Sequence, residues 1–168
     1  MKIKGLKIVF LSLLGFGLLF GCSTNKIQPD HTTPTDWKIV NARGIFSFSV
    51  PKDLQERAVQ GIDSYVGEYK SQSMNLSFDF GMWSNSLDDS SQPQFQQLVT
   101  EINHEPAKIV LYTAPQSQTE YNYFAGVHFP SEKNPTGKLT MSVRCKDSES
   151  QKTAVKIFYS IKFLQRNA

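Results

Sequence analysis

Cysteine is scarce in this chain, and that scarcity excludes a disulfide framework. The 168 residues contain two cysteines, Cys22 and Cys145. A set of cross-links that staples a small exported fold needs four or more cysteines. The stability of the chain must therefore come from a hydrophobic core.

Motifs for common reaction chemistry are absent as well. There is no Gly-x-Ser-x-Gly elbow, no glycine-rich phosphate loop and no His-Glu-x-x-His. His31, His104 and His128 are too far apart in the sequence to form a ligand cluster typical of a metal site. These absences favour a non-catalytic protein that needs no metal or cofactor. The alternative is an enzyme, for example a hydrolase, with a site near Asp79 or His128 that no motif reveals.

The one long apolar run is too short for a comfortable membrane span. Residues 8–20 are apolar apart from glycines and Ser12, and three lysines and no acidic residue precede them. A span needs about 20 apolar residues, whereas a basic start followed by about a dozen apolar residues is typical of a secretory signal peptide. The sequence therefore predicts a signal peptide at residues 1–21.

The run ends in Leu19-Phe20-Gly21-Cys22, which resembles the lipobox of bacterial lipoproteins. The resemblance implies that Cys22 receives diacylglycerol, that the leader is cut off before it, and that the new amino group is acylated. Two or three acyl chains hold a protein stably on a membrane. In enteric members of that family an aspartate after the cysteine causes retention in the inner membrane. Ser23 stands there, so we expect the outer membrane if the host is Gram-negative. The alternative is an uncleaved anchor helix with a chance cysteine.

Net charge is also lacking once the leader is removed. Three of the 18 basic residues lie in residues 1–21 with no acid, so 15 remain against 15 acidic residues. A nucleic-acid-binding protein would carry a basic face, and none is present. The expected partners are the membrane, through the lipid, and an envelope protein or a small ligand.

After the leader the chain divides into a tether and a domain. Residues 22–36 hold two prolines, four threonines and one aliphatic residue, too little apolar surface to fold, so they predict a flexible tether. Residues 37–168 are long enough for one globular domain.

Alternation of apolar and polar side chains dominates the domain and predicts antiparallel strands with one buried face. A turn at Gly61 separates two of these strands, and Asn-Pro with a glycine predicts a turn at 131–138. The predicted strands lie at 46–50, 54–60, 64–70, 74–82, 121–129 and 139–146.

Two segments carry helical spacing. Residues 95–113 fit either a helix or a hairpin with strands at 97–102 and 107–113, and the β-rich sequence after Pro106 favours the hairpin. Ser148 with Gln151 three residues later forms a capping-box pattern. It predicts a helix at 149–159, followed by a short strand at 161–164.

The stretches "FSFSVP", "INHEPAKIVLY" and "TAVKIFYSIKF" resemble those of Mog1/PsbP-like domains, over about residues 37–165. The resemblance implies an α+β fold, an antiparallel β-sheet flanked by helices in an α/β/α sandwich, with a C-terminal helix followed by a short strand. It implies no function, because this fold hosts unrelated roles.

The candidate binding residues are Trp83, Leu87, Asp88 and Asp89, in the loop after the strand at 74–82. Bulky apolar and acidic side chains mix there, and tryptophan is a frequent binding anchor. The alternative is that Trp83 folds back to cap the sheet edge. Asp88 and Asp89 lack the ligand spacing and turn glycine of a calcium loop, so we expect a solvated acidic loop.

Two further residues have competing interpretations. Asp79 lies on the polar side of its strand and, if semi-buried, needs a partner, for which Arg57, Lys70 and Arg144 are the candidates. Cys145 could be a nucleophile with a histidine base. Alternation with its neighbours instead favours a small buried thiol.

Overall fold

The computed structural model describes residues 32–113, 120–130 and 137–164. The predicted leader at 1–21, the lipidation site at Cys22 and most of the tether lie outside these ranges, as does most of the predicted turn at 131–138. Within the described ranges no helix is long and apolar enough to cross a membrane.

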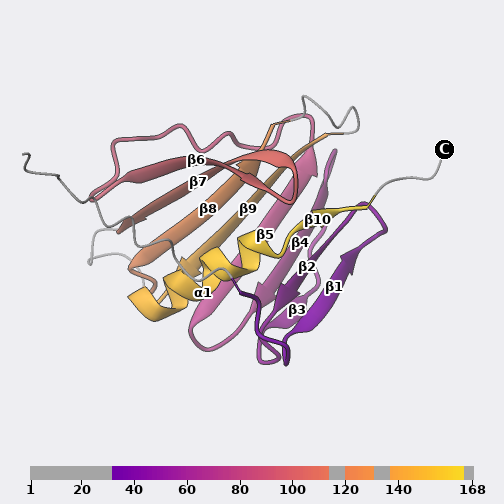
Figure 1. Ribbon diagram of the computed structural model, residues 1–168, viewed down its shortest axis with the longest axis horizontal. Helices are drawn as coiled ribbons and strands as arrows, with labels where there is room; N and C mark the ends of the chain where they lie inside the picture. Colours follow the sequence, from indigo (N-terminus) through magenta and orange to yellow (C-terminus); the bar gives the residue numbers. More distant parts are fainter. Residues whose placement is uncertain (1–31, 114–119, 131–136, 165–168) are drawn as a thin grey trace, which may run out of the picture.

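The described residues form strands and one helix in an α+β arrangement (Figure 1). In chain order the elements are β1 (Lys38–Ala42), β2 (Phe46–Val50), β3 (Gln55–Arg57), β4 (Tyr65–Lys70), β5 (Met74–Gly81), β6 (Gln96–Ile102), β7 (Glu105–Thr113), β8 (Tyr123–Phe129), β9 (Lys138–Cys145), α1 (Ser148–Tyr159) and β10 (Lys162–Phe163).

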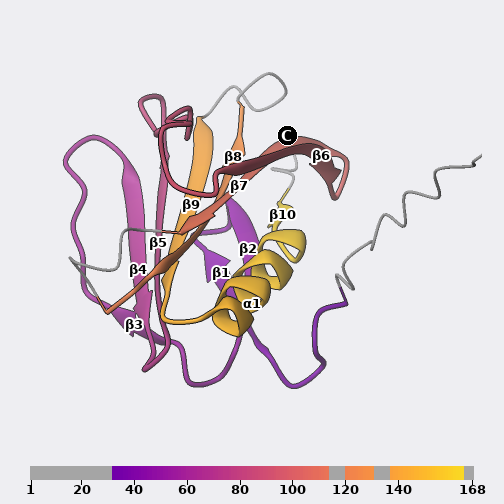
Figure 2. The same cartoon turned by 90° about the vertical axis from the view of Figure 1, so that its left-hand side faces the viewer.

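The strands build two antiparallel sheets. The larger has the order β3-β4-β5-β9-β8-β7-β6, and the smaller has the order β1-β2-β10. Every pairing is antiparallel, as the alternating sequence pattern predicts. The smaller sheet and α1 pack on the same side of the larger sheet, while the loop between β3 and β4 arches over the other side (Figure 2).

The core lies between the larger sheet and the layer made by α1 and the smaller sheet. Phe46 and Phe48 of β2 are buried and meet Phe78 of β5 edge to face, with ring centroids 5.3 and 6.0 Å apart. Ile157 and Phe158 of α1 are fully buried in the same cluster. The alternating sequence pattern correctly predicts the buried faces of β2 and β5, because each strand has one face toward this core.

The helix begins one residue earlier than its sequence signal predicts. Asp147 is the N-cap, and its carboxylate accepts a hydrogen bond from the Ser150 amide at 2.7 Å. The predicted capping box from Ser148 to Gln151 is therefore wrong. The Gln151 amide instead donates to the Phe124 carbonyl at 2.7 Å, which ties α1 to β8.

The ambiguous segment at 95–113 is a hairpin, as the sequence favours. β6 and β7 are joined by Asn103 and His104, both with positive φ, of 49° and 69°. Positive φ at both central residues gives the turn whose twist suits a two-residue hairpin. The Asn103 amide donates to the Ile161 carbonyl at 2.6 Å, so the turn also holds the end of α1.

Three expectations need correction. The strand predicted at 54–60 shrinks to β3, and Met82 is 71% exposed rather than on the buried face. The expected α/β/α sandwich has helices on both sides of the sheet. In the described part of the chain α1 is the one helix, and it covers a single side.

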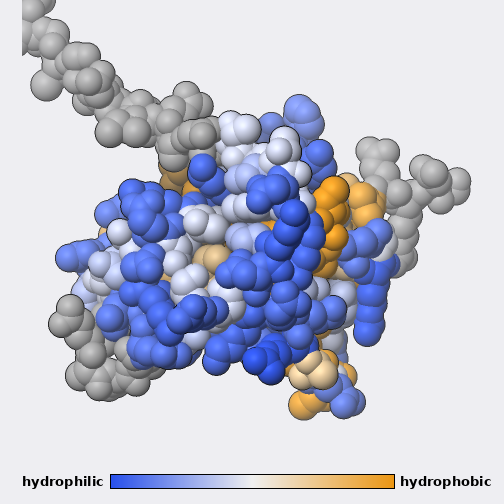
Figure 3. Space-filling view, turned by 90° about the horizontal axis from the view of Figure 1, so that it is seen from below, coloured by the Kyte–Doolittle hydropathy of each residue, from blue (hydrophilic) through white to orange (hydrophobic). Residues whose placement is uncertain are grey.

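Exposed apolar side chains are scattered over this fold. Seen from below, most of the surface is hydrophilic, with hydrophobic side chains in separate places that include its right-hand side (Figure 3). The large apolar residues that are exposed are Ile39, Val59, Ile62, Met82, Trp83, Leu98, Val99 and Leu164.

Candidate functional site

The side of the larger sheet that faces away from α1 is here called the outward face. Residues directly opposite one another on neighbouring strands share a face. Asp79, Thr140, His128 and Lys108 therefore form one row on it, across β5, β9, β8 and β7. The loop of residues 82–95, the crossing loop, passes over this row, so parts of the outward face are buried without a helix.

A hydrogen-bond chain holds the crossing loop to the sheet. The Thr140 hydroxyl donates to the Asn85 carbonyl at 2.5 Å, and His128 Nδ1 lies 2.9 Å from the same hydroxyl oxygen. Because a threonine hydroxyl has one hydrogen, His128 Nδ1 must carry the proton and donate. Burial lowers the pKa of His128, and the charges of Lys108 and Lys138 lower it further. The neutral ring therefore has a structural role in this chain.

Leu87 packs on the sheet where β8 has a glycine. A Cβ atom built on Gly126 would lie 2.7 Å from Leu87 Cδ1, so only glycine leaves room for the leucine. Leu87 has a positive φ of 58°, and its amide donates to the Asn85 side chain at 2.6 Å. This local turn directs the Leu87 side chain toward the sheet, and its packing there holds the crossing loop in place.

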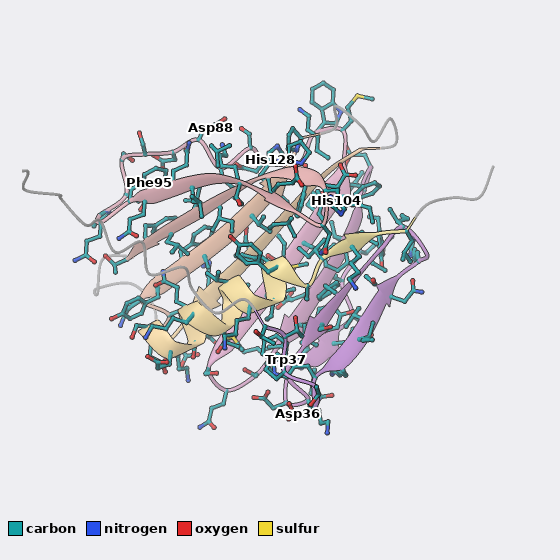
Figure 4. The ribbon with its side chains drawn as sticks, in the orientation of Figure 1. Asp36, Trp37, Asp88, Phe95, His104 and His128 are labelled. Atoms are coloured by element: carbon teal, nitrogen blue, oxygen red, sulfur yellow. The ribbon has the colours of Figure 1, made fainter. Side chains whose placement is uncertain are left out.

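The two acidic residues of the crossing loop are satisfied by separate partners. Asp88 pairs with Lys108 of β7 and accepts from Ser86, and these hydrogen bonds lower the pKa of its carboxyl. Asp88 and His128 lie at the same part of the sheet, while His104 marks the β6–β7 turn (Figure 4). The loop therefore has an ionic attachment as well as the Thr140 contact.

The Asp89 carboxylate forms its hydrogen bonds within the crossing loop. Its oxygens accept from the Ser91 hydroxyl at 2.5 Å and from the Gln92 side chain at 2.9 Å, and these hydrogen bonds lower the pKa of the Asp89 carboxyl. Across the described residues, no three His, Cys, Asp or Glu side chains lie close enough to hold a metal ion.

Trp83 is 81% exposed. The interpretation that it folds back to cap the sheet edge is wrong. The four candidate binding residues therefore do not form one cluster: Leu87 lies against Gly126, Asp88 on Lys108, and Asp89 within its own turn.

Two adjoining depressions flank the crossing loop on the outward face. The first, of about 290 Å³, has Ser77, Asp79 and Thr140 in its floor and Val59 and Asn85 at its sides. The second, of about 300 Å³, is lined by residues that include Leu87, Asp89, Tyr112 and Phe124. Asn85 and Ser142 line both. We call the two depressions together the outer groove.

The two ends of the outer groove differ in chemistry. At one end Tyr112 and Phe124 stack with ring centroids 4.3 Å apart and planes inclined by 13°. At the other end the first depression contains two carboxylates, Glu68 and Asp79. Both ends offer hydrogen-bond acceptors, since Asp89 lines the second depression, and only the second adds a stacked ring surface.

Asp79 lacks the partner that the sequence analysis expects. Its side chain is half-buried, and Oδ1 is fully covered with no hydrogen-bond partner among the described residues. Opposite it stand Val66 on β4 and Thr140 on β9. The three basic candidates face other positions. Arg57 lies opposite Glu68, and Lys70 and Arg144 lie opposite Asn75. The prediction of a paired Asp79 is wrong.

Cys145 and His128 point to opposite sides of the sheet. His128 shares the outward face with Thr140, whereas Cys145 is fully buried in the core. Burial raises the pKa of the Cys145 thiol to about 12. The prediction of a small buried thiol is confirmed, and a Cys–His reaction pair is excluded.

Sequence reasoning did not identify Asn85, Ser142, Tyr112 or Glu68 as residues of one groove. One available signal was Phe124, a large aromatic residue on the polar side of β8. A large aromatic ring on a polar strand face indicates that something covers that face.

Comparison with known proteins adds no assignment. A scan against protein-family models gives no match, and a search of curated proteins finds no relative.

Proposed function

We propose that this chain is a lipid-anchored cell-envelope protein whose domain is a non-catalytic binding or accessory module. The anchor is supported by the basic start, the short apolar run and the ending Leu19-Phe20-Gly21-Cys22. The domain is Mog1/PsbP-like in this proposal. Its antiparallel sheet and its C-terminal helix followed by a short strand support that fold, while a second helical layer is not among the described residues.

The binding role rests chiefly on the outer groove. Ligand sites are concave, mainly apolar surfaces with a few placed polar groups, and occupy about 300–1,000 Å³. The two depressions, at about 290 and 300 Å³, combine stacked rings with carboxylates and hydroxyls. Among the described residues that line them there is no histidine or cysteine, so the usual base and thiol nucleophile are missing.

One observation favours the alternative of an envelope hydrolase. Glu68 and Asp79 line the same depression, and a pair of carboxylates is what most glycoside hydrolases use. Release of reducing sugar from envelope polysaccharide by the wild type, abolished by Asp79→Asn, would favour the enzyme. We expect no such release.

The groove can be tested by blocking it. Ser142 lies between the two depressions, so Ser142→Trp should fill the outer groove at a strand position where the added ring has room outside the core. Val99→Trp is the matched control, because Val99 is 74% exposed on the outward side of edge strand β6. An extract of envelope small molecules should raise the melting temperature of the wild type and the control. An equal rise in Ser142→Trp would contradict a binding role for the groove.

The anchor is tested by labelling growing cells with radioactive palmitate. The wild type and Cys145→Ser should take up label, whereas Cys22→Ser should not and should keep its leader. An unmodified Cys22 within an intact N-terminus would refute the lipoprotein assignment. In a Gram-negative host, membrane fractionation should place the protein in the outer membrane.

A further inference from the structure

The turn that leads out of β5 carries two large apolar side chains at its centre. The Ser84 amide donates to the Gly81 carbonyl at 3.5 Å, so Met82 and Trp83 are the two central residues of this turn. Glycine, proline and small polar residues are the usual occupants of such positions. Met82 is 71% exposed and Trp83 is 81% exposed. Because the domain covers neither side chain, packing within the fold does not explain why apolar residues stand there.

A third exposed apolar side chain belongs to the same end of the larger sheet. Tyr65, the first residue of β4, stands opposite Phe80 near the end of β5, so the loop before β4 meets the turn after β5. A Cβ atom built on Gly81 would lie 2.7 Å from Ser64 Cβ, which shows how closely the two segments approach. Ile62, two residues before Ser64, is fully exposed. We define the apolar tip as Ile62, Met82 and Trp83.

Basic residues accompany the apolar tip. Lys138, the first residue of β9, stands opposite Gly81. The Arg43 guanidinium lies over the Tyr65 ring, 4.3 Å from its centroid. Asp63, in the loop before β4, is an acidic residue at the same end. Exposed apolar side chains with basic neighbours match the surface of a membrane, where lipid tails lie beneath anionic headgroups.

The proposed lipid anchor would leave this end of the domain within reach of a membrane. Trp37 precedes β1 at the end of that strand away from Arg43 (Figure 4), so the tether enters far from the apolar tip. Residues 22–36 can span at most about 50 Å, whereas β5, with eight residues, is about 27 Å long. The tether is therefore long enough to let the apolar tip face the lipid. A tethered surface also needs few contacts, because the tether keeps its effective concentration at the membrane high.

We propose that the apolar tip inserts into the headgroup region of a membrane. In this orientation Arg43 and Lys138 face anionic lipids. Tryptophan is enriched at that depth, because its ring is apolar and its N–H group is polar. None of the three residues of the apolar tip lines the outer groove, so the lipid contact leaves the groove open. The inference rests on the proposed function only for the anchor, which brings the domain to the membrane.

The two tryptophans of the chain form a matched pair of probes. Trp83 lies in the apolar tip, whereas Trp37 is partly buried against the core. The full chain is reconstituted into vesicles of phosphatidylethanolamine and phosphatidylglycerol, with or without bromine atoms high on the acyl chains, since bromine quenches the fluorescence of a nearby indole.

Each tryptophan is read in the variant that lacks the other. Trp37→Phe leaves Trp83 alone, and we expect brominated lipid to reduce its emission by about half or more, because the ring lies at the level of the headgroups. Trp83→Phe leaves Trp37 alone and should keep its emission. If Trp37→Phe does not fold, the difference in emission between the wild type and Trp83→Phe gives the same signal.

Substitutions at exposed positions locate the contact. Ile62→Ser combined with Met82→Ser, in the Trp37→Phe background, should reduce the quenching at least about twofold, because two apolar side chains are lost from the lipid contact. Ile39→Ser combined with Val99→Ser is the matched control, since both residues are exposed on other strands, and should leave the quenching unchanged. Equal quenching of the two tryptophans, or an equal effect of the two double substitutions, would overturn the inference.

Failure of this inference can be told apart from failure of the proposed function. If Cys22 takes up palmitate but Trp83 is not quenched, the anchor stands and the inference fails. If Cys22 takes up no palmitate and Trp83 is still quenched, the inference stands and the anchor proposal fails. The response of Ser142→Trp to envelope extract tests the outer groove alone.

Discussion

His128 donates a hydrogen bond from Nδ1 to the Thr140 hydroxyl at 2.9 Å, and Thr140 passes its own hydrogen to the Asn85 carbonyl. The crossing loop is therefore held by a chain that ends on a buried imidazole ring, and burial lowers the pKa of that ring. The stability of the domain should depend on the charge of this one ring.

Acidification should destabilise the domain through His128. Burial and the charges of Lys108 and Lys138 lower its pKa in the folded state, and Asp88 acts in the opposite direction. The unfolded chain then binds this proton more readily, so the contribution is full above about pH 6.5 and is lost as the pH falls toward the lower folded pKa. Urea unfolding at about pH 7.5 and 5.5 should show a smaller difference for His128→Asn than for the wild type. Equal differences in the two proteins would refute the role of His128.

Gly126→Ala should push the crossing loop off the sheet. The new methyl group would lie 2.7 Å from Leu87 Cδ1 and 2.9 Å from the Phe124 ring. Overpacking of this kind costs about 1–3 kcal/mol. In a Leu87→Ala background the clash with the leucine is gone, so the cost of Gly126→Ala should fall by a coupling energy measurable in a double-mutant cycle. Additive effects would mean that Leu87 does not rest on Gly126.

Trp83→Ala should barely change stability. The ring is 81% exposed, and substitutions at exposed positions stay within about 0.5 kcal/mol. Trp37→Ala is the matched control, because Trp37 packs partly buried against the core and should cost distinctly more. Thermal melts of both variants decide this. Loss of an envelope partner by Trp83→Ala at unchanged stability would identify Trp83 as a binding anchor.

The Cys145 thiol should be inert in the folded protein. It is fully buried, and burial raises its pKa to about 12, so almost no thiolate exists near neutral pH. In a Cys22→Ser variant it is the only thiol. A chromogenic disulfide reagent at about pH 8 should react slowly with the folded protein and fully after guanidinium is added. Rapid reaction before denaturation would contradict the burial.

Residues 37–168 expressed alone should be a folded, soluble monomer. Their buried residues form one contiguous cluster, which needs neither metal nor cross-link. Thermal melts with a chelator or with a reductant should match the untreated melt. A large drop with chelator would reveal a metal site.

The strands could be predicted from the sequence where one face meets the core and the other meets solvent. β2 and β5 are examples, since burial alternates along each of them. β1 escaped notice because Ile39, one of its aliphatic residues, is 76% exposed, so its apolar residues do not all lie on one face. Its place is fixed by pairing with β2 rather than by its own pattern.

The outer groove could not be predicted because it depends on contacts between distant residues. Asn85 meets Thr140 across 55 positions of the chain, and Leu87 meets Gly126 across 39. The alternation of apolar and polar residues along a strand carries no information about contacts between residues this far apart. The N-cap was missed for a different reason: Asp147 and Ser148 are both good caps, and the sequence alone does not choose between neighbours.

The pairing of β10 with β2 sets an order on folding. Phe46 and Ser47 form their ladder with residues that appear about 115 positions later, and the Ser49 amide donates to the Ser160 side chain across 111 positions. Contacts this remote form late and slow the closing of a core. The smaller sheet thus remains incomplete until the last strand has left the ribosome. Such a delay would keep the chain open enough to be threaded through a secretion channel, as the proposed export requires.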